Sequence, residues 1–252
     1  MKKDRLQKSL ELFGLQTIID AVNEGKEFDK IFMEKGLNTG LAMELRTLLK
    51  KHNIMFKAVP VEKLNRLTKK DHQGVFAFVS PVNFYSLGDV LMQTFEDGQS
   101  PLFLMLDRVT DVRNFGAIAR TAESCGVHAI ILPKIGGAQL NSDAMKTSTG
   151  ALMHIPICRE QNLHHSLKYL KKSGLKVIAC TEKTETNMYD VPFIDPIVIV
   201  MGSEENGISD EILELADAKT RIPMYGKTES LNVSVATAVM LYEAVRQRQL
   251  KP

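Results

Sequence analysis

The stretch that decides the fold lies near the C-terminus and reads Ile222-Pro223-Met224-Tyr225-Gly226-Lys227-Thr228-Glu229-Ser230-Leu231-Asn232-Val233-Ser234-Val235-Ala236. Its first half is polar and loop-forming, whereas apolar residues dominate after Ser230 and predict a helix that runs through Leu241 and Val245. Ser230 is the candidate N-cap, and Asn232 would lie in the first turn beside backbone N–H groups that lack helix partners. A polar loop that leads into a buried helix suits a polar ligand. An ordinary strand–loop–helix connection explains the same pattern equally well.

Four continuous apolar runs upstream of this stretch predict strands that are covered on both faces, as in a parallel sheet. Segments with helical spacing lie between them. This alternation predicts an α/β domain with its sites at the carboxyl ends of the strands. The predicted strands are 102–106, 129–132, 175–180 and 197–201, and the predicted helices are 117–125, 143–147, 164–172 and 210–216.

The first 80 residues predict a separate, small α/β unit. Residues 81–100 contain Pro81, Gly88 and Gly98 around one helical piece, 87–95, and are interpreted as a linker to a domain over 101–252. Within the first unit, the predicted helices are 15–22, 41–49 and 61–67, and the predicted strands are 30–33, 54–59 and 72–79.

Charge is unevenly placed along the 252 residues, although the formal net charge is only +2. Residues 1–73 hold 15 Lys and Arg against 10 Asp and Glu. A basic unit attached to a near-neutral body suits a polyanionic partner such as RNA, and a solvated charged surface without a partner is the simpler alternative.

Several other classes of protein are not expected. No apolar run spans a bilayer, and the basic N-terminus is not followed by a secretory signal. Cys125, Cys158 and Cys180 are far apart, which indicates reduced thiols in the cytoplasm. The six histidines lack metal-ligand spacing, so no metal site is expected.

The loop after Leu106 concentrates polar groups at a predicted strand end. If the following helix begins near Asn114, then Asn114 is its cap and Arg120 lies less than two turns later. An arginine among small apolar helix residues usually has a carboxylate or phosphate partner. A salt bridge to Asp107 or Glu204 is the structural alternative.

The loop after Met201 reads Gly202-Ser203-Glu204-Glu205-Asn206-Gly207-Ile208-Ser209. It has the glycine spacing of a phosphate-binding loop, but Ile208 stands where that loop needs lysine, which excludes an NTPase. The glycines still allow a tight turn and close approach to a ligand, and Ser209 can cap the next helix.

Together these loops resemble the motifs of the SpoU/TrmH family of RNA ribose 2′-O-methyltransferases, within the SPOUT class. The first motif is similar to 114–122, the second to 202–207 and the third to 222–236, while 148–151 also resembles a family segment. The resemblance spans roughly 102–248. The N-terminal unit, ending in His72-Gln73-Gly74-Val75, resembles the ribosomal-protein-like RNA-binding domain fused to many members. Val112 departs from the family, which commonly has proline there and hence a stiffer loop.

The resemblance implies a deep trefoil knot in the parallel-sheet domain, which is an exception to the rule against threaded loops. It implies S-adenosylmethionine bound by the knot loops, with Gly202, Ile222 and Leu231 contacting it largely through backbone groups and Thr181 as a further contact. It also implies a homodimer with the site near the interface.

The resemblance further implies catalysis by Arg120, Asn114, Glu204, Ser230 and Asn232. Because guanidinium stays protonated in proteins, we expect Arg120 to bind a phosphate and stabilise the developing alkoxide rather than act as the base. The fused N-terminal domain favours ribosomal RNA as substrate, with transfer RNA as the runner-up. A non-catalytic RNA-binding protein is a second class of function, and the missing glycine fingerprint argues against a nucleotide-dependent oxidoreductase.

Overall fold

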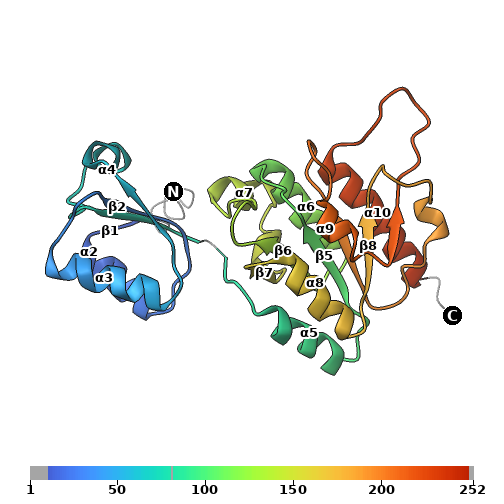
Figure 1. The fold of residues 1–252 in the computed structure, drawn as a ribbon, viewed down its shortest axis with the longest axis horizontal. Helices are drawn as coiled ribbons and strands as arrows, with labels where there is room; N and C mark the ends of the chain where they lie inside the picture. The colour runs from blue at the N-terminus through green and yellow to red at the C-terminus, as the bar shows by residue number, and fades with distance from the viewer. Residues whose placement is uncertain (1–10, 81, 250–252) are drawn as a thin grey trace. The chain divides into compact units, whose positions relative to one another are not determined.

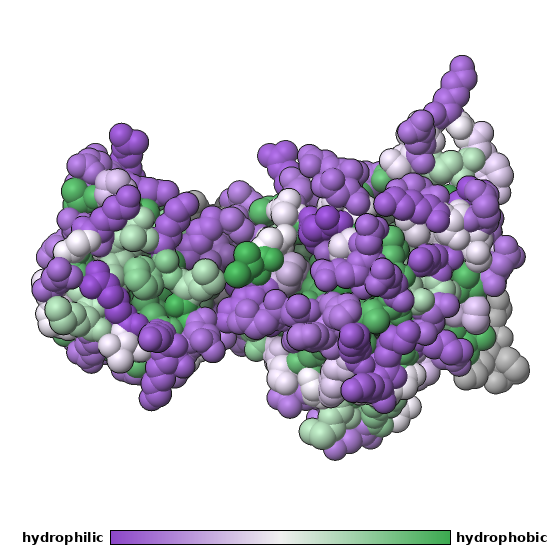
Figure 2. All heavy atoms as spheres, viewed as in Figure 1, coloured by the Kyte–Doolittle hydropathy of each residue, from purple (hydrophilic) through white to green (hydrophobic). Residues whose placement is uncertain are grey.

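The computed structural model describes residues 11–80 and 82–249, and the chain divides into two compact units. The first covers the described residues up to Val82 together with 140–142, and the second covers 83–139 and 143–249 (Figure 1). Figure 2 shows hydrophilic residues over most of the visible surface, with hydrophobic residues confined to small patches. No helix in the described ranges has the length and apolar character that a membrane span requires.

The first unit is a four-stranded sheet in the order β1-β4-β2-β3, in which only the β2–β3 pair is parallel. Helices α2 and α3 bury one face of this sheet, and α4 packs on the other. The predicted helices and strands are confirmed, whereas the short edge strand β1 was not predicted. The elements are β1 (Glu11–Phe13), α2 (Leu15–Asn23), β2 (Phe28–Glu34), α3 (Gly40–Lys51), β3 (Phe56–Val59), α4 (Val61–Leu67) and β4 (Val75–Val79).

The second unit is a six-stranded sheet in the order β10-β8-β9-β5-β6-β7, and every pair in it is parallel. The predicted parallel α/β domain is therefore confirmed, while the trefoil knot stays a prediction. The elements are α5 (Leu87–Glu96), β5 (Leu102–Leu106), α6 (Val112–Ser124), β6 (Ala129–Pro133), α7 (Ser142–Thr147), η1 (Ala151–Met153), β7 (Ile157–Glu160), α8 (Leu163–Lys172), β8 (Lys176–Cys180), η2 (Met188–Asp190), β9 (Ile197–Met201), α9 (Asp210–Leu213), β10 (Ala218–Thr220) and α10 (Val233–Gln249).

The central strands are apolar along their whole length because helices cover the sheet. All five residues of β5 and of β9 are buried. Helix α5, within the segment interpreted as a linker, adds Leu87 and Leu91 to the core that contains Phe103 of β5.

Two predicted helix starts are wrong. Helix α6 begins at Val112, because the Asp111 carboxylate accepts the Asn114 backbone N–H at 2.7 Å and so caps the helix two residues before the start predicted near Asn114. Helix α10 begins at Val233 rather than directly after Ser230. The Asn232 side chain accepts the Ser234 N–H at 3.0 Å, so Asn232 does the capping that was predicted for Ser230.

Smaller differences concern the ends of the second sheet. The edge strands β7 and β10 were not predicted, and α9 stops at Leu213 instead of continuing to Ala216. Ser209 occupies the N-cap position of α9 as predicted, but its side chain makes no capping hydrogen bond. These short edge elements lack the apolar runs that mark the central strands.

Candidate functional site

Four strand ends bring the three polar loops to one edge of the second sheet. Leu106 of β5 is level with Met201 of β9, Met201 with Cys180 of β8, and Cys180 with Thr220 of β10. Because all four strands are parallel, the residues that follow them emerge side by side. The loops after β5, β9 and β10 therefore lie together at this edge, as predicted from the sequence, and that they form one site stays a prediction.

A hydrogen-bond network joins the loops after β9 and β10 to the first turn of α6, which follows the loop after β5. One oxygen of the Glu204 carboxylate accepts from the side-chain amides of Asn114, at 3.2 Å, and of Asn232. The same oxygen accepts the first backbone N–H of α10, from Val233, at 3.2 Å. Asn232 also donates to the Asn114 side-chain oxygen at 3.1 Å, which closes a triangle of three side chains. Charge-assisted bonds of this kind fix the three loops relative to one another.

Arg120 and Ser230 stand outside this network. Arg120 is exposed on α6, and its guanidinium makes no hydrogen bond or ion pair with any residue that the structure describes. The alternative salt bridges are not formed, because Asp107 accepts the Ser209 N–H at 2.7 Å and Glu204 is engaged with the two asparagines. Ser230 is also exposed, in the loop that precedes α10. The guanidinium is thus available for an anionic ligand.

The loop after β9 is closed on itself. Ser203 and Gly207 exchange two backbone hydrogen bonds of 3.1 and 2.9 Å. A Cβ on Gly202 would lie 2.1 Å from the carbonyl carbon of Gly207, so only glycine fits at this position. Arg108 adds a bond of 3.1 Å from its guanidinium to the Gly207 carbonyl oxygen.

The loop after β10 is open by contrast. From Ile222 to Leu231 it makes no backbone hydrogen bond to the described part of the chain. Tyr225 in this loop is 92% exposed, whereas Ile222 and Leu231 at its two ends are half-buried. The N–H and C=O groups of these two end residues and of Gly202 therefore remain available to a ligand at the sheet edge.

Thr181 follows β8 and is buried between these loops. Its N–H donates to the Thr220 carbonyl at 2.9 Å, and its hydroxyl accepts the Lys183 N–H at 3.2 Å. Burial, with a smaller effect of Glu182, raises the pKa of the neighbouring Cys180 thiol to about 12. Cys180 therefore stays protonated at neutral pH and does not supply a thiolate nucleophile. Within residues 11–80 and 82–249, no group of three His, Cys, Asp or Glu side chains is placed to hold a metal ion.

Comparison with known proteins agrees with this geometry. The model of the SpoU rRNA methylase family matches residues 101–242, which contain all three loops. The chain belongs to the SpoU family of RNA methyltransferases. A second family model, for the substrate-binding domain of RNA 2′-O ribose methyltransferases, matches residues 12–85.

Two of three similar proteins match the chain over nearly its full length. YacO of Bacillus subtilis, which carries the name of a TrmH-family tRNA/rRNA methyltransferase, is 33% identical over 94% of this chain and 95% of its own length. An rRNA methyltransferase of Sinorhizobium meliloti, crystallised with S-adenosylmethionine, is 25% identical with a TM-score of 0.60 and covers 100% of this chain and 92% of its own. A TrmH/SpoU tRNA-modifying enzyme of A. aeolicus is 38% identical over 60% of this chain and 77% of its own, with a TM-score of 0.56.

One contributor to the site was missed in the sequence. Arg108 was not among the candidates, yet it ties the loop after β5 to the loop after β9 through Gly207. Its backbone φ of 60° lies in the left-handed region, which no sequence pattern around a non-glycine residue reveals. Its position two residues after a buried strand was the only available signal.

Proposed function

We propose that this SpoU-family enzyme methylates a ribose 2′-hydroxyl in structured RNA, with ribosomal RNA as the favoured substrate. The observation that carries the proposal is the triangle of Asn114, Glu204 and Asn232, which unites the three motif loops beside a helix that presents an unpaired arginine. A polar site with a guanidinium that has no partner among the described residues suits alignment of two reactants near a phosphate.

S-adenosylmethionine is the methyl donor of the family, and the residues at the sheet edge fit it. Gly202, Ile222 and Leu231 would hold it through backbone groups that have no partner in the described chain, and Thr181 would contact it from the end of β8. When bound, it supplies an electrophilic methyl group on a sulfonium centre. The closed loop at Gly202 allows backbone contact without a side chain in the way.

In this proposal the residues of the chain align and activate the hydroxyl. Arg120 binds the phosphate next to the target ribose and stabilises the negative charge that develops on the 2′-oxygen. A phosphate oxygen accepts the proton, because guanidinium is already protonated. Asn114, Glu204 and Asn232 hold the motif loops in register, and Ser230 orients the ribose from the open loop.

Arg120→Ala tests this role. Loss of the guanidinium should lower methyl transfer by about 10²–10³-fold, as for other donors that stabilise an oxyanion. Binding of S-adenosylmethionine, measured by calorimetry, should stay near that of the wild type. Arg120→Lys should restore activity only in part, since ammonium lacks the planar fork. Arg113→Ala, an exposed arginine on the same helix, is the matched control, and near-normal turnover of Arg120→Ala would refute the assignment.

The choice of substrate is tested by transfer of labelled methyl to unmodified ribosomal RNA and to bulk transfer RNA in parallel. Label at a ribose 2′-oxygen of ribosomal RNA supports the proposal. Label only in transfer RNA would support the proposed reaction but show that transfer RNA is the substrate. Cofactor binding without transfer to either RNA would favour a non-catalytic RNA-binding protein. We propose a substrate-binding domain over 1–80 and a methyltransferase domain over 101–252, in a cytoplasmic protein with free thiols. Of the segment 81–100 interpreted as a linker, helix α5 packs into the core of the second unit.

We also propose that the protein acts as a homodimer through α10. This helix packs on α6 with one face, yet Val235 and Tyr242 on another face are 49% and 57% exposed, with Val239 half-buried between them. An apolar stripe on both sides of a helix indicates a second partner. Tyr242→Glu should therefore convert a dimer to a monomer in sedimentation experiments. Tyr169→Glu, which changes an exposed tyrosine on α8, should leave the mass unchanged.

A further inference from the structure

One face of the N-terminal sheet carries an aromatic cluster that stays partly open. Helices α2 and α3 pack on the opposite face. On the face that carries the cluster, Phe76 is fully buried, whereas Phe13 and Phe78 are partly exposed. The short helix α4 closes only part of this face, through Leu64 and Leu67.

The rings of this cluster are held in fixed orientations. Phe78 meets Phe76 edge-to-face with ring centroids 5.0 Å apart, and it meets Phe32 in the same manner at 6.5 Å. Such contacts between aromatic rings restrain a side chain that would otherwise rotate. Phe78 therefore presents a partly exposed ring in a defined position.

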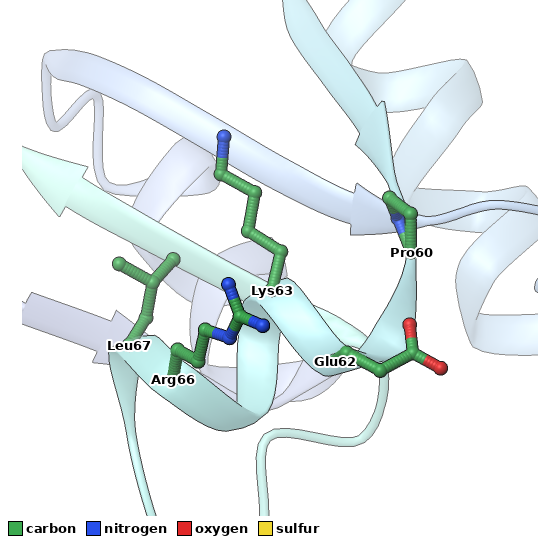
Figure 3. A pocket seen from close by; sticks show the side chains of 5 residues that line it. All are labelled: Pro60, Glu62, Lys63, Arg66 and Leu67. Atoms are coloured by element: carbon green, nitrogen blue, oxygen red, sulfur yellow. The ribbon is translucent and has the colours of Figure 1, made fainter.

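Basic groups surround these rings. The Lys63 ammonium lies 4.9 Å from the centroid of Phe32, and that of Lys70 lies 5.1 Å from the centroid of Phe13. Lys63 and Arg66 also line an open groove of about 590 Å³ along α4 (Figure 3).

Positive charge outweighs negative charge along this edge. Residues 60–71 hold four cations, Lys63, Arg66, Lys69 and Lys70, and two acids, Glu62 and Asp71. Figure 3 shows Glu62 near Pro60 and pointing away from Lys63, which extends from α4 over the strands. Glu11 on β1 and Lys30 on β2 both lie level with Phe78, so one acid and one base flank this ring. Two of the four cations, Lys63 and Lys70, therefore lie against rings of the cluster.

We propose that this aromatic-basic face, formed by Phe13, Phe78, Lys63, Arg66 and Lys70, binds an unpaired segment of the RNA substrate. The inference rests on the proposed function for the identity of the ligand as RNA. Unpaired bases expose their π-faces and stack on aromatic side chains, while the cations contact the phosphates. A duplex hides its base faces, so the face selects a loop or bulge and directs the catalytic unit to it.

The electrostatic part is tested with the full chain, by fluorescence anisotropy of a short labelled single-stranded RNA across a salt series. The double variant Lys63→Gln/Arg66→Gln should bind more weakly, and the slope of log affinity against log salt should fall by about 0.7 for each phosphate that the variant no longer neutralises. Lys50→Gln/Lys51→Gln removes the same charge from the exposed end of α3, on the opposite side of the sheet, and should leave the slope unchanged.

The stacking part is tested with Phe78→Leu, which should weaken binding of the single strand about fivefold or more. Phe78→Tyr keeps the ring and should bind as the wild type does. Phe56→Leu is the matched control, because Phe56 is exposed and its place on β3 alternates with Val59 of the cluster, so it faces the other side. Thermal melting shows whether each variant is folded.

Equal affinity of the wild type for the single strand and for a blunt duplex of the same sequence would overturn the inference. The inference would also be overturned if each test variant bound the single strand as tightly as its matched control. Methyl transfer to ribosomal RNA, measured on the same preparations, separates this result from the proposed function. If the wild type transfers methyl groups but the variants bind the single strand as tightly as the wild type does, only the role of the aromatic-basic face is refuted. If Phe78→Leu weakens RNA binding but no methyl transfer is seen, the role of the face is supported and the proposed activity is refuted.

Discussion

The loop after β9 and the loop after β10 lie at the same edge of one sheet, yet they are built in opposite ways. The first is closed by two backbone hydrogen bonds between Ser203 and Gly207 and leaves no room for a Cβ at Gly202. The second makes no backbone hydrogen bond to the described chain between Ile222 and Leu231. If both loops contact the proposed cofactor, they form a preformed half and an adaptable half of its site, joined by Glu204. A ligand would meet a rigid surface on one side and order the loop on the other.

The largest effect is expected from a methyl group placed in the closed loop. Gly202→Ala forces the Gly207 backbone to move, which should cost about 1–3 kcal/mol of stability and abolish measurable binding of S-adenosylmethionine. Calorimetry and thermal denaturation measure the two effects. Gly226→Ala, in the open loop, is the control because no atom lies within 4 Å of its added Cβ. Equal cofactor affinity of the two variants would remove the distinction between the loops.

A smaller effect is expected when the link between the loops is weakened. Glu204→Gln replaces an oxygen that accepts from Asn114, Asn232 and the Val233 N–H by a neutral amide. The loss of charge-assisted bonds, about 1.5–3 kcal/mol, should slow methyl transfer roughly 10- to 100-fold. Glu205→Gln changes the exposed neighbour and should leave the rate near that of the wild type. A Glu204→Gln enzyme with full activity would show that the triangle has no role in turnover.

The smallest effect, and the most direct view of the comparison, is expected in amide hydrogen exchange. Amides without hydrogen bonds exchange rapidly, so residues 224–230 should exchange much faster than 203–207 in the free protein. Added S-adenosylmethionine should slow exchange mainly in 224–230, where new order is created. Mass spectrometry of peptides from the two loops measures this. Equal protection of both loops before addition would contradict the assignment of an open loop.

The central strands and the meeting of the three loops were predictable from the sequence, because apolar runs such as 197–201 have few alternatives to a covered parallel strand. The residues at which helices α6 and α10 begin were not predictable from the sequence. Ser230, Asn232, Asp111 and Asn114 are all acceptable N-caps, and their local sequences do not decide which of them captures the first free N–H. The competition was decided by tertiary contacts of the loops, including the bond from Val233 to Glu204.

The partners of Arg120 are a second feature that the sequence alone does not predict. Its place on an apolar helix was predicted, but whether a carboxylate would neutralise it depended on which groups Asp107 and Glu204 meet across the sheet edge. Asp107 is engaged by the Ser209 N–H, 102 residues later in the chain. Pairings at such separation follow from the strand order, which a single sequence leaves open.

The triangle of side chains also has a consequence for the order in which the two units of the enzyme fold. Asn114 and Asn232 are 118 residues apart in the chain, and their contact requires β5, β9 and the start of α10 to be in place. Contacts of such long range form late in folding, because the closure of a long loop precedes any gain from the contact. The N-terminal unit, with its own core, can be complete much earlier. During synthesis the molecule would therefore pass through a stage in which it can hold RNA before it is able to modify it.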